Sequence, residues 1–262
     1  RTNILAIILI VVISIAAFQA IWIWSLMVPG DDGTTGQNKS EKKLEEIYDH
    51  TSSDAYIMRN LVYDVNYGKT SYTMWIQYTY STYFKYKLNK THEFQRSSRL
   101  EEGEALEEFC TTADVKKIAE RIKSNCDPNS TEEIVDAVMT FVQDDGNFTQ
   151  SIHYVEEYDD IPRYPVETIC EGNGDCEDKS ILFVSMLESI GIQTVLIMLP
   201  EFCLAGVNMS SAPTHSKSGE TYNVKYGGDT YYMCDVSVSG YFVGDLAKKY
   251  RDEPTWIIEV NP

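Results

Sequence analysis

The stretch Gly174-Asp175-Cys176-Glu177-Asp178 begins a segment that has apolar residues on nearly every side and that Gly191 ends. This pattern predicts a helix buried between two layers of structure. Cys176 stands at the start of that helix, where the positive end of the helix dipole favours a thiolate. Such a position is typical of a nucleophilic cysteine, so the fold and the candidate site are both centred on this segment.

Strands are predicted after the helix. Apolar, β-branched or alternating runs bounded by turn residues occur at 194–199, 203–207, 221–226 and 230–236, with Gly227-Gly228 between the last two. Such runs indicate an antiparallel meander. One helix packed on an antiparallel sheet gives an α+β fold.

Further elements are predicted before the helix. Alternation over residues 55–77 around Asn66-Tyr67-Gly68-Lys69 indicates a β-hairpin. Helical spacing predicts helices over 114–123 and after the capping box that begins at Ser130. Residues 42–50 suggest a short helix. A helical cluster of Tyr80, Tyr83, Phe84 and Leu88 is assigned to the core.

Four segments carry a resemblance to a known family: residues 158–168, 172–180, 231–235 and 240–245. Together they resemble the transglutaminase-like superfamily, and in particular its archaeal membrane-anchored members, over roughly residues 55–250. The resemblance implies a papain-like fold with a Cys-His-Asp site. In such a site a base takes the thiol proton and a carboxylate orients the base.

The resemblance assigns a role to three positions. Cys176 is the nucleophile, Asp235 is the orienting acid, and Phe202 occupies the position of the family histidine. Phenylalanine cannot accept a proton, and general-base catalysis contributes roughly 10²–10⁴-fold. The acidic neighbours of Cys176 also oppose a thiolate by like charge. We therefore expect impaired catalysis.

Histidines elsewhere in the chain are the candidates for a substitute base. His153 and His215 lie in predicted loops, and His50 and His92 are further from the motif in sequence. Loop histidines seldom act in catalysis, so we expect no rescue.

The six cysteines permit disulfides in an oxidising compartment. We expect Cys203 and Cys234 to point away from the central helix and to pair if their strands are adjacent. Cys110 and Cys126 flank the 114–123 helix, and either is a candidate partner for Cys170. No Cys or His spacing fits a zinc site, and the acidic run 156–160 lacks the ligand spacing of a calcium loop. We expect neither a metal nor a cofactor.

The N-terminal region predicts membrane attachment. Residues 4–28 are apolar and uncharged, long enough to span a bilayer. Arg1 precedes this span and Asp31-Asp32 follow it, which places the rest of the chain outside the cytoplasm. Residues 29–43 suggest a flexible linker and 44–262 a globular domain, giving a single-pass protein of the cell membrane.

The acidic charge argues against a nucleic-acid role, and the sequons support an outside location. The net charge of −18 leaves no basic patch for nucleic acid. Five Asn-x-Ser/Thr sequons predict N-linked glycans, at Asn38, Asn89, Asn129, Asn147 and Asn208.

Three functional hypotheses follow. The first, which we favour, is a catalytically impaired domain that binds protein partners as a scaffold or accessory subunit of a membrane or surface assembly. The second is an active thiol peptidase, amidase or protein cross-linking acyltransferase that works through a thioester at Cys176. The third is a pilin-like filament subunit whose first 28 residues pack helix on helix.

Overall fold

The computed structural model describes residues 42–47 (backbone only), 55–90, 105–146, 149–156, 161–217 and 219–260. The predicted membrane span, most of the linker, Asn38, Asn147, His50 and His92 lie outside these residues. Within them, no helix has the length and apolarity needed to cross a membrane.

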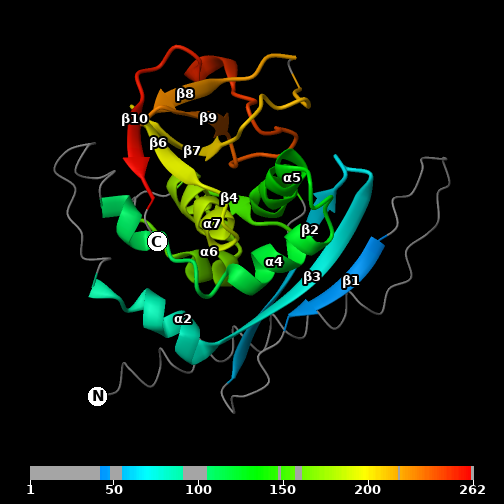
Figure 1. Ribbon diagram of the computed structural model, residues 1–262. Helices are drawn as coiled ribbons and strands as arrows, with labels where there is room; N and C mark the ends of the chain where they lie inside the picture. The colour runs from blue at the N-terminus through cyan, green and yellow to red at the C-terminus, as the bar shows by residue number, and fades with distance from the viewer. Residues whose placement is uncertain are drawn as a thin grey trace. The chain divides into compact units, whose positions relative to one another are not determined.

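The first sheet contains the predicted hairpin (Figure 1). Strands β2 (Tyr56–Val65) and β3 (Thr70–Thr79) pair antiparallel, with Tyr56 opposite Thr79. Positive φ angles at Asn66, Tyr67 and Gly68 close the turn, and the Lys69 amide donates to the Asn66 carbonyl at 3.2 Å. This prediction is confirmed because the turn residues adopt the left-handed backbone that a tight hairpin requires.

The prediction of a short helix over residues 42–50 is wrong. The backbone of Lys42–Ile47 forms strand β1, parallel to β3, with Lys42 opposite Ser71, so the sheet order is β1-β3-β2. A helix of nine residues is marginal by itself. The free edge of β3 offers backbone groups to a strand instead.

Helix α2 (Tyr80–Lys87) begins directly after β3, capped by the Thr79 hydroxyl, which accepts from the Thr82 amide at 3.0 Å. The helix was predicted, but its assignment to the core was wrong in part. Tyr80, Phe84 and Leu88 are 38%, 44% and 76% exposed. The helix follows the end of β3 and packs on α6, and among the described residues this leaves these three side chains exposed (Figure 1).

Two helices of the next segment are confirmed. Helix α4 (Lys116–Ser124) buries Ile118 and Ile122, and α5 (Thr131–Val142) is capped by Ser130, whose hydroxyl accepts from the Glu133 amide at 3.1 Å. Shorter elements in this region are η2 (Glu107–Phe109), β4 (His153–Tyr154), α6 (Pro165–Glu171) and β5 (Asn173–Gly174). Strand β4 runs parallel to β5.

Helix α7 (Cys176–Ser189) is the central helix, and every residue from Cys176 to Leu187 is buried. It packs on α4, α5 and α6 and on strands β6 and β7 (Figure 1). The Ile192 amide donates to the Leu187 carbonyl across Gly191, where φ is +81°. The predicted buried helix and its glycine stop are confirmed.

The second sheet is antiparallel, as predicted, but it is not a simple meander. Its strands are β6 (Thr194–Leu199), β7 (Phe202–Asn208), β8 (Asn223–Tyr226), β9 (Asp229–Cys234) and β10 (Trp256–Glu259). Their order is β10-β6-β7-β9-β8, so β9 lies between β7 and β8. A short helix, η3 (Lys248–Tyr250), precedes β10. The fold is thus a mixed α/β one in which helices pack on an antiparallel sheet.

Candidate functional site

Cys176 is the first residue of α7 and is 6% exposed. Asp175 caps the helix, because its side chain accepts from the Asp178 amide at 3.1 Å. The short pairing of β4 with β5 holds the chain just before this cap. The cysteine therefore stands at a helix start, as the sequence predicted.

The surroundings of the thiol keep it protonated. Cys176 Sγ donates to Glu177 Oε2 at 2.8 Å and accepts from the Cys203 amide at 3.4 Å. Burial, followed by the Glu177 charge, raises the pKa of Cys176 well above its ordinary value. The helix dipole acts in the opposite direction but contributes at most about 2 kcal/mol. The thiol therefore donates a hydrogen bond to a carboxylate, and its surroundings disfavour the thiolate.

The backbone of Phe202 lies near this thiol, because the amide of the next residue, Cys203, contacts Sγ. The Phe202 ring stacks on Tyr250 with centroids 4.5 Å apart and planes 18° apart. Lys249 Nζ lies 4.4 Å from the Tyr250 centroid and 6.0 Å from that of Phe202. The residue at the expected histidine position thus belongs to an aromatic stack under a lysine.

Asp235 directly follows β9 and is buried. Its Oδ1 accepts from the Ser237 hydroxyl at 2.6 Å and from the Ser237 amide at 3.1 Å. Burial raises the pKa of Asp235, opposed by these bonds and by the charges of Lys249 and Lys179. The carboxylate is thus bound by Ser237. Its predicted role in orienting a base stays a prediction.

Lys179 is a functional candidate that sequence reasoning missed. It lies one turn after Cys176, is fully buried, and donates from Nζ to the carbonyls of Ile152 at 2.6 Å and Ser237 at 3.3 Å. Desolvation lowers its pKa to about 7, opposed by the charges of Asp144 and Asp235 among others. The sequence feature that could have identified it is a lysine inside a helix predicted to be buried. It fastens α7 to the segments that carry β4 and Asp235.

The two histidines within the described residues are engaged by carboxylates. His153 Nδ1 lies 3.3 Å from Asp144 Oδ1, and His215 Nδ1 lies 3.1 Å from Glu132 Oε1. His215 also stacks on Tyr67. That neither histidine replaces the missing base stays a prediction.

A cavity of about 640 Å³ lies beside the Phe202–Tyr250 stack. We call it the Phe202 groove. The charge of Cys176 acts on the pKa of both Tyr250 and Lys249, which places the groove near the thiol. Its lining residues are Tyr154, Glu156, Leu199, Pro200, Glu201, Phe202, Lys249, Tyr250 and Glu253. The groove therefore combines aromatic walls with three carboxylates and one ammonium group.

The predicted disulfides are not formed. All six cysteines are free and buried. Ala205, not Cys203, is opposite Cys234, and a diagonal pair across two strands is too far apart for a disulfide. Cys203 also faces α7 rather than away from it, since its thiol meets Ser180. Cys110 and Cys126 instead donate to the Leu106 and Ile122 carbonyls.

Three of the sequon asparagines lie within the described residues. Asn89 and Asn129 are exposed, and Asn208 is half-buried with its amide donating to Gln193 Oε1 at 2.8 Å. No group of three or more His, Cys, Asp or Glu side chains within the described residues has metal-binding geometry.

Comparison with protein families identifies the central part of the chain. Residues 116–200 match the transglutaminase-like superfamily. This part of the chain is a transglutaminase-like domain. The match runs from α4 to the end of β6 and includes Cys176, but it ends before Phe202 and Asp235. The family match therefore covers the helix that begins at Cys176. The roles assigned to Phe202 and Asp235 rest on the resemblance described from the sequence.

Two solved structures resemble this chain at low sequence identity. Two solved structures of Legionella pneumophila LapG, one EGTA-treated and one calcium-bound, are similar at 16% and 17% identity. The similarity covers 67% and 66% of this chain and 83% and 84% of theirs, with a TM-score of 0.25 in both cases. No curated protein matches the chain.

Proposed function

We propose that this chain is a membrane-anchored, extracytoplasmic protein whose transglutaminase-like domain has lost most of its catalytic power and binds a protein partner at the Phe202 groove. The observation that carries this proposal is the contact of Cys176 Sγ with Glu177 Oε2 at 2.8 Å. A nucleophilic cysteine needs a base or a cation beside it. Here its nearest ionisable partner is a carboxylate.

The Phe202 position supports the same proposal. Its ring is stacked on Tyr250, so the position next to the thiol holds a hydrophobic contact instead of a proton acceptor. The same stack forms one wall of the groove, together with Lys249 and Glu201. Aromatic rings and a charged rim are the groups that recur at protein-binding surfaces. In this proposal the apolar run 4–28 anchors the chain in the membrane. N-linked glycans are attached at the sequon asparagines.

The test of impaired catalysis is the alkylation rate of each cysteine in the full chain, held in detergent, as a function of pH. Burial raises the pKa of Cys126 to about 12, which makes it a control within the same sample. We expect Cys176 to label as slowly as Cys126 from pH 6 to 7.5. Fast labelling of Cys176 near pH 6 would show a low-pKa thiolate and would favour the active thiol enzyme instead.

The test of binding uses a photo-crosslinking amino acid placed at Glu201, on the groove, and at Lys117, on an exposed turn of α4 outside it. The full chain is expressed in its native membrane and irradiated. We expect a discrete crosslinked partner from position 201 and none from position 117. Equal crosslinking from both positions would contradict binding at the groove.

A further inference from the structure

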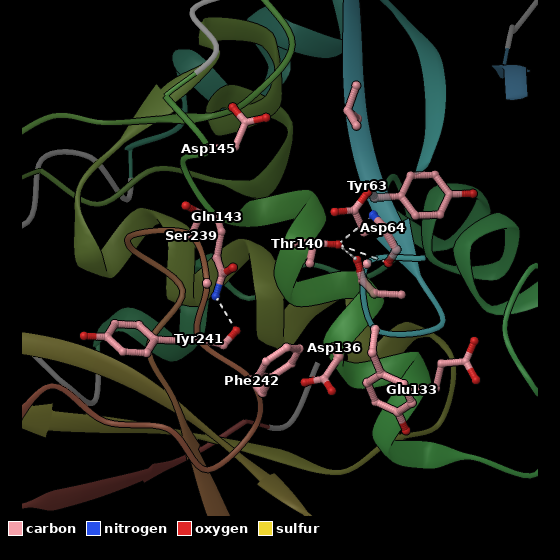
Figure 2. A pocket seen from close by; sticks show the side chains of 15 residues that line it. Tyr63, Asp64, Glu133, Asp136, Thr140, Gln143, Asp145, Ser239, Tyr241 and Phe242 are labelled. Atoms are coloured by element: carbon pink, nitrogen blue, oxygen red, sulfur yellow. Dashed lines mark hydrogen bonds between the residues drawn. The ribbon is translucent and has the colours of Figure 1, made fainter. Parts of the chain in front are cut away.

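A second cavity, of about 180 Å³, lies between α5, the β2–β3 hairpin and the segment 239–242. Figure 2 shows it from close by. We call it the Asp136 cavity. Four acidic residues line it, namely Asp64, Glu133, Asp136 and Asp145, and none of its lining residues is Lys, Arg or His. Its lining therefore contains acidic groups and no basic one.

Asp136 is the unusual member of this lining. The residue is 4% exposed, and its Oδ1 accepts from the Val243 amide at 2.8 Å. Its Oδ2 is buried and has no hydrogen-bond partner within the described residues. A buried carboxylate oxygen without a partner costs free energy, so a native protein normally supplies one. A ligand in the cavity is a natural source of that partner.

Two neighbouring acids have partners of their own. Glu133 Oε1 accepts from the Asn66 amide at 3.1 Å, and Asp64 accepts from the Ser71 hydroxyl. Figure 2 shows the Asp136 carboxyl group pointing toward Phe242 from α5. Asp136 is thus the acid whose second oxygen is left for an occupant.

Charge around Asp136 is also uncompensated. Burial raises its pKa to about 8, opposed by the Val243 amide and reinforced by the charges of Glu132, Asp245 and Glu133. The Asp136 charge acts in turn on Cys234, which is buried on β9, and on Tyr67 of the hairpin turn. These groups are acidic or neutral, so a cation in the cavity lowers the cost of the Asp136 charge.

Aromatic rings form the remaining walls. The cavity is lined by Tyr63, Tyr67, Tyr241 and Phe242. Tyr67 is fixed by its stack on His215, with centroids 3.4 Å apart, and it meets Phe242 edge to face at 6.5 Å. Lys217 Nζ already lies 5.0 Å from the Tyr241 centroid without lining the cavity. Aromatic faces beside carboxylates are the combination that binds organic cations.

We propose that the Asp136 cavity binds a small organic ammonium ion, which pairs with Asp136 Oδ2 and packs against Tyr67, Tyr241 and Phe242. A volume of about 180 Å³ is below the range of drug-sized sites and suits a molecule of a few heavy atoms. A metal ion is a poorer occupant, since the described residues contain no metal-binding cluster and aromatic rings are not ligands for hard cations.

The site is connected to the thiol site by Gln143. Its side chain lines the cavity, and its Nε2 donates to the carbonyls of Asp235 at 3.2 Å and Tyr241 at 3.0 Å. An occupant that contacts Gln143 therefore also stabilises the segment that carries Asp235.

The experiment is titration calorimetry of the full chain in detergent with propylammonium, and with propan-1-ol as its neutral counterpart, in 0.15 M salt. We expect saturable binding of propylammonium at pH 9 and none of propan-1-ol. Lowering the pH from 9 to 6.5 is expected to weaken binding at least tenfold, because Asp136 becomes protonated while an alkylammonium stays charged.

Variants make the test specific. Asp136→Asn keeps the shape of the side chain and is expected to lower the affinity at least tenfold and to abolish the pH dependence. Tyr241→Leu, which removes an aromatic wall, is expected to weaken binding as well. Glu120→Gln removes an exposed carboxylate of α4 that lines neither cavity, and it is the control that leaves binding unchanged. Equal binding of propan-1-ol, or unchanged binding by a folded Asp136→Asn protein, would overturn the proposal.

Discussion

Replacing Lys179 by methionine tests whether this lysine is desolvated beneath the thiol site. Lys179 is fully buried, and its pKa falls from 10.5 to about 7 on folding. Between these two pKa values the unfolded chain binds a proton that the folded chain does not. Stability therefore rises with pH across this window, and the penalty is largest at and below pH 7. Methionine has a similar length and does not titrate.

The magnitude follows from the two pKa values. One proton contributes up to 1.36 kcal/mol per pH unit. From pH 7 to 9 the folded lysine goes from half protonated to almost neutral while the unfolded one stays charged, so the wild-type protein gains about 2 kcal/mol that the variant does not. For a domain of this size, this corresponds to a relative change in Tm of about 4 to 8 °C.

The assay is thermal unfolding of both proteins in detergent at half-unit pH steps from 6 to 9.5, followed by near-ultraviolet circular dichroism. Taking the difference between the two profiles cancels other titrations, such as that of Asp136, which is perturbed mainly by burial and by acidic neighbours. Lys117→Met is the matched control, because Lys117 is exposed on α4. Its profile is expected to parallel that of the wild type.

One result would refute the reasoning. If the wild-type and Lys179→Met profiles run parallel from pH 7 to 9, then Lys179 remains charged in the folded protein. Its contacts with the Ile152 and Ser237 carbonyls would then offset the desolvation of a buried ammonium group.

Three further predictions concern the thiol and the core. Glu177→Gln removes the carboxylate that lies 2.8 Å from Cys176 Sγ, so alkylation of Cys176 at pH 7.5 should be at least tenfold faster. The rate is measured by mass spectrometry, and an unchanged rate would contradict our account of the thiol. Phe202→His in that background should accelerate labelling further at pH 6.5, since imidazole accepts the proton; the same gain from Phe202→Leu would mean only looser packing. Gly206→Ala should lower stability by about 1 to 3 kcal/mol. The reason is that the added Cβ would lie 2.8 Å from Val195 Cγ2, and an unchanged urea midpoint would show that the strands can separate without cost.

Elements that depend on local pattern were predictable. The hairpin at Asn66, the cap at Ser130 and the glycine stop at Gly191 all follow from residues within one turn of each other. The burial of α7 was equally clear, because an all-round apolar helix has no solvent face to offer.

Pairings between distant segments were not predictable. Strand β1 was predicted as a helix, because nothing local shows the free edge of β3 that it joins. The position of β9 between β7 and β8 is a property of the whole sheet. For the same reason the cysteine pairing failed, since it depended on a register that places Ala205 opposite Cys234.

The sequence by itself determined that a cysteine begins a buried helix, which is a consequence of residue type and periodicity. The assignment of Phe202 to the histidine position comes from the resemblance and stays a prediction. Only the tertiary structure decided the state of that cysteine, through the rotamer that joins it to Glu177 and the burial that raises its pKa. It also brought Asp136, Tyr67 and Phe242 around one cavity from three distant segments. Electrostatic energies depend on distance and burial, and the packed chain sets both.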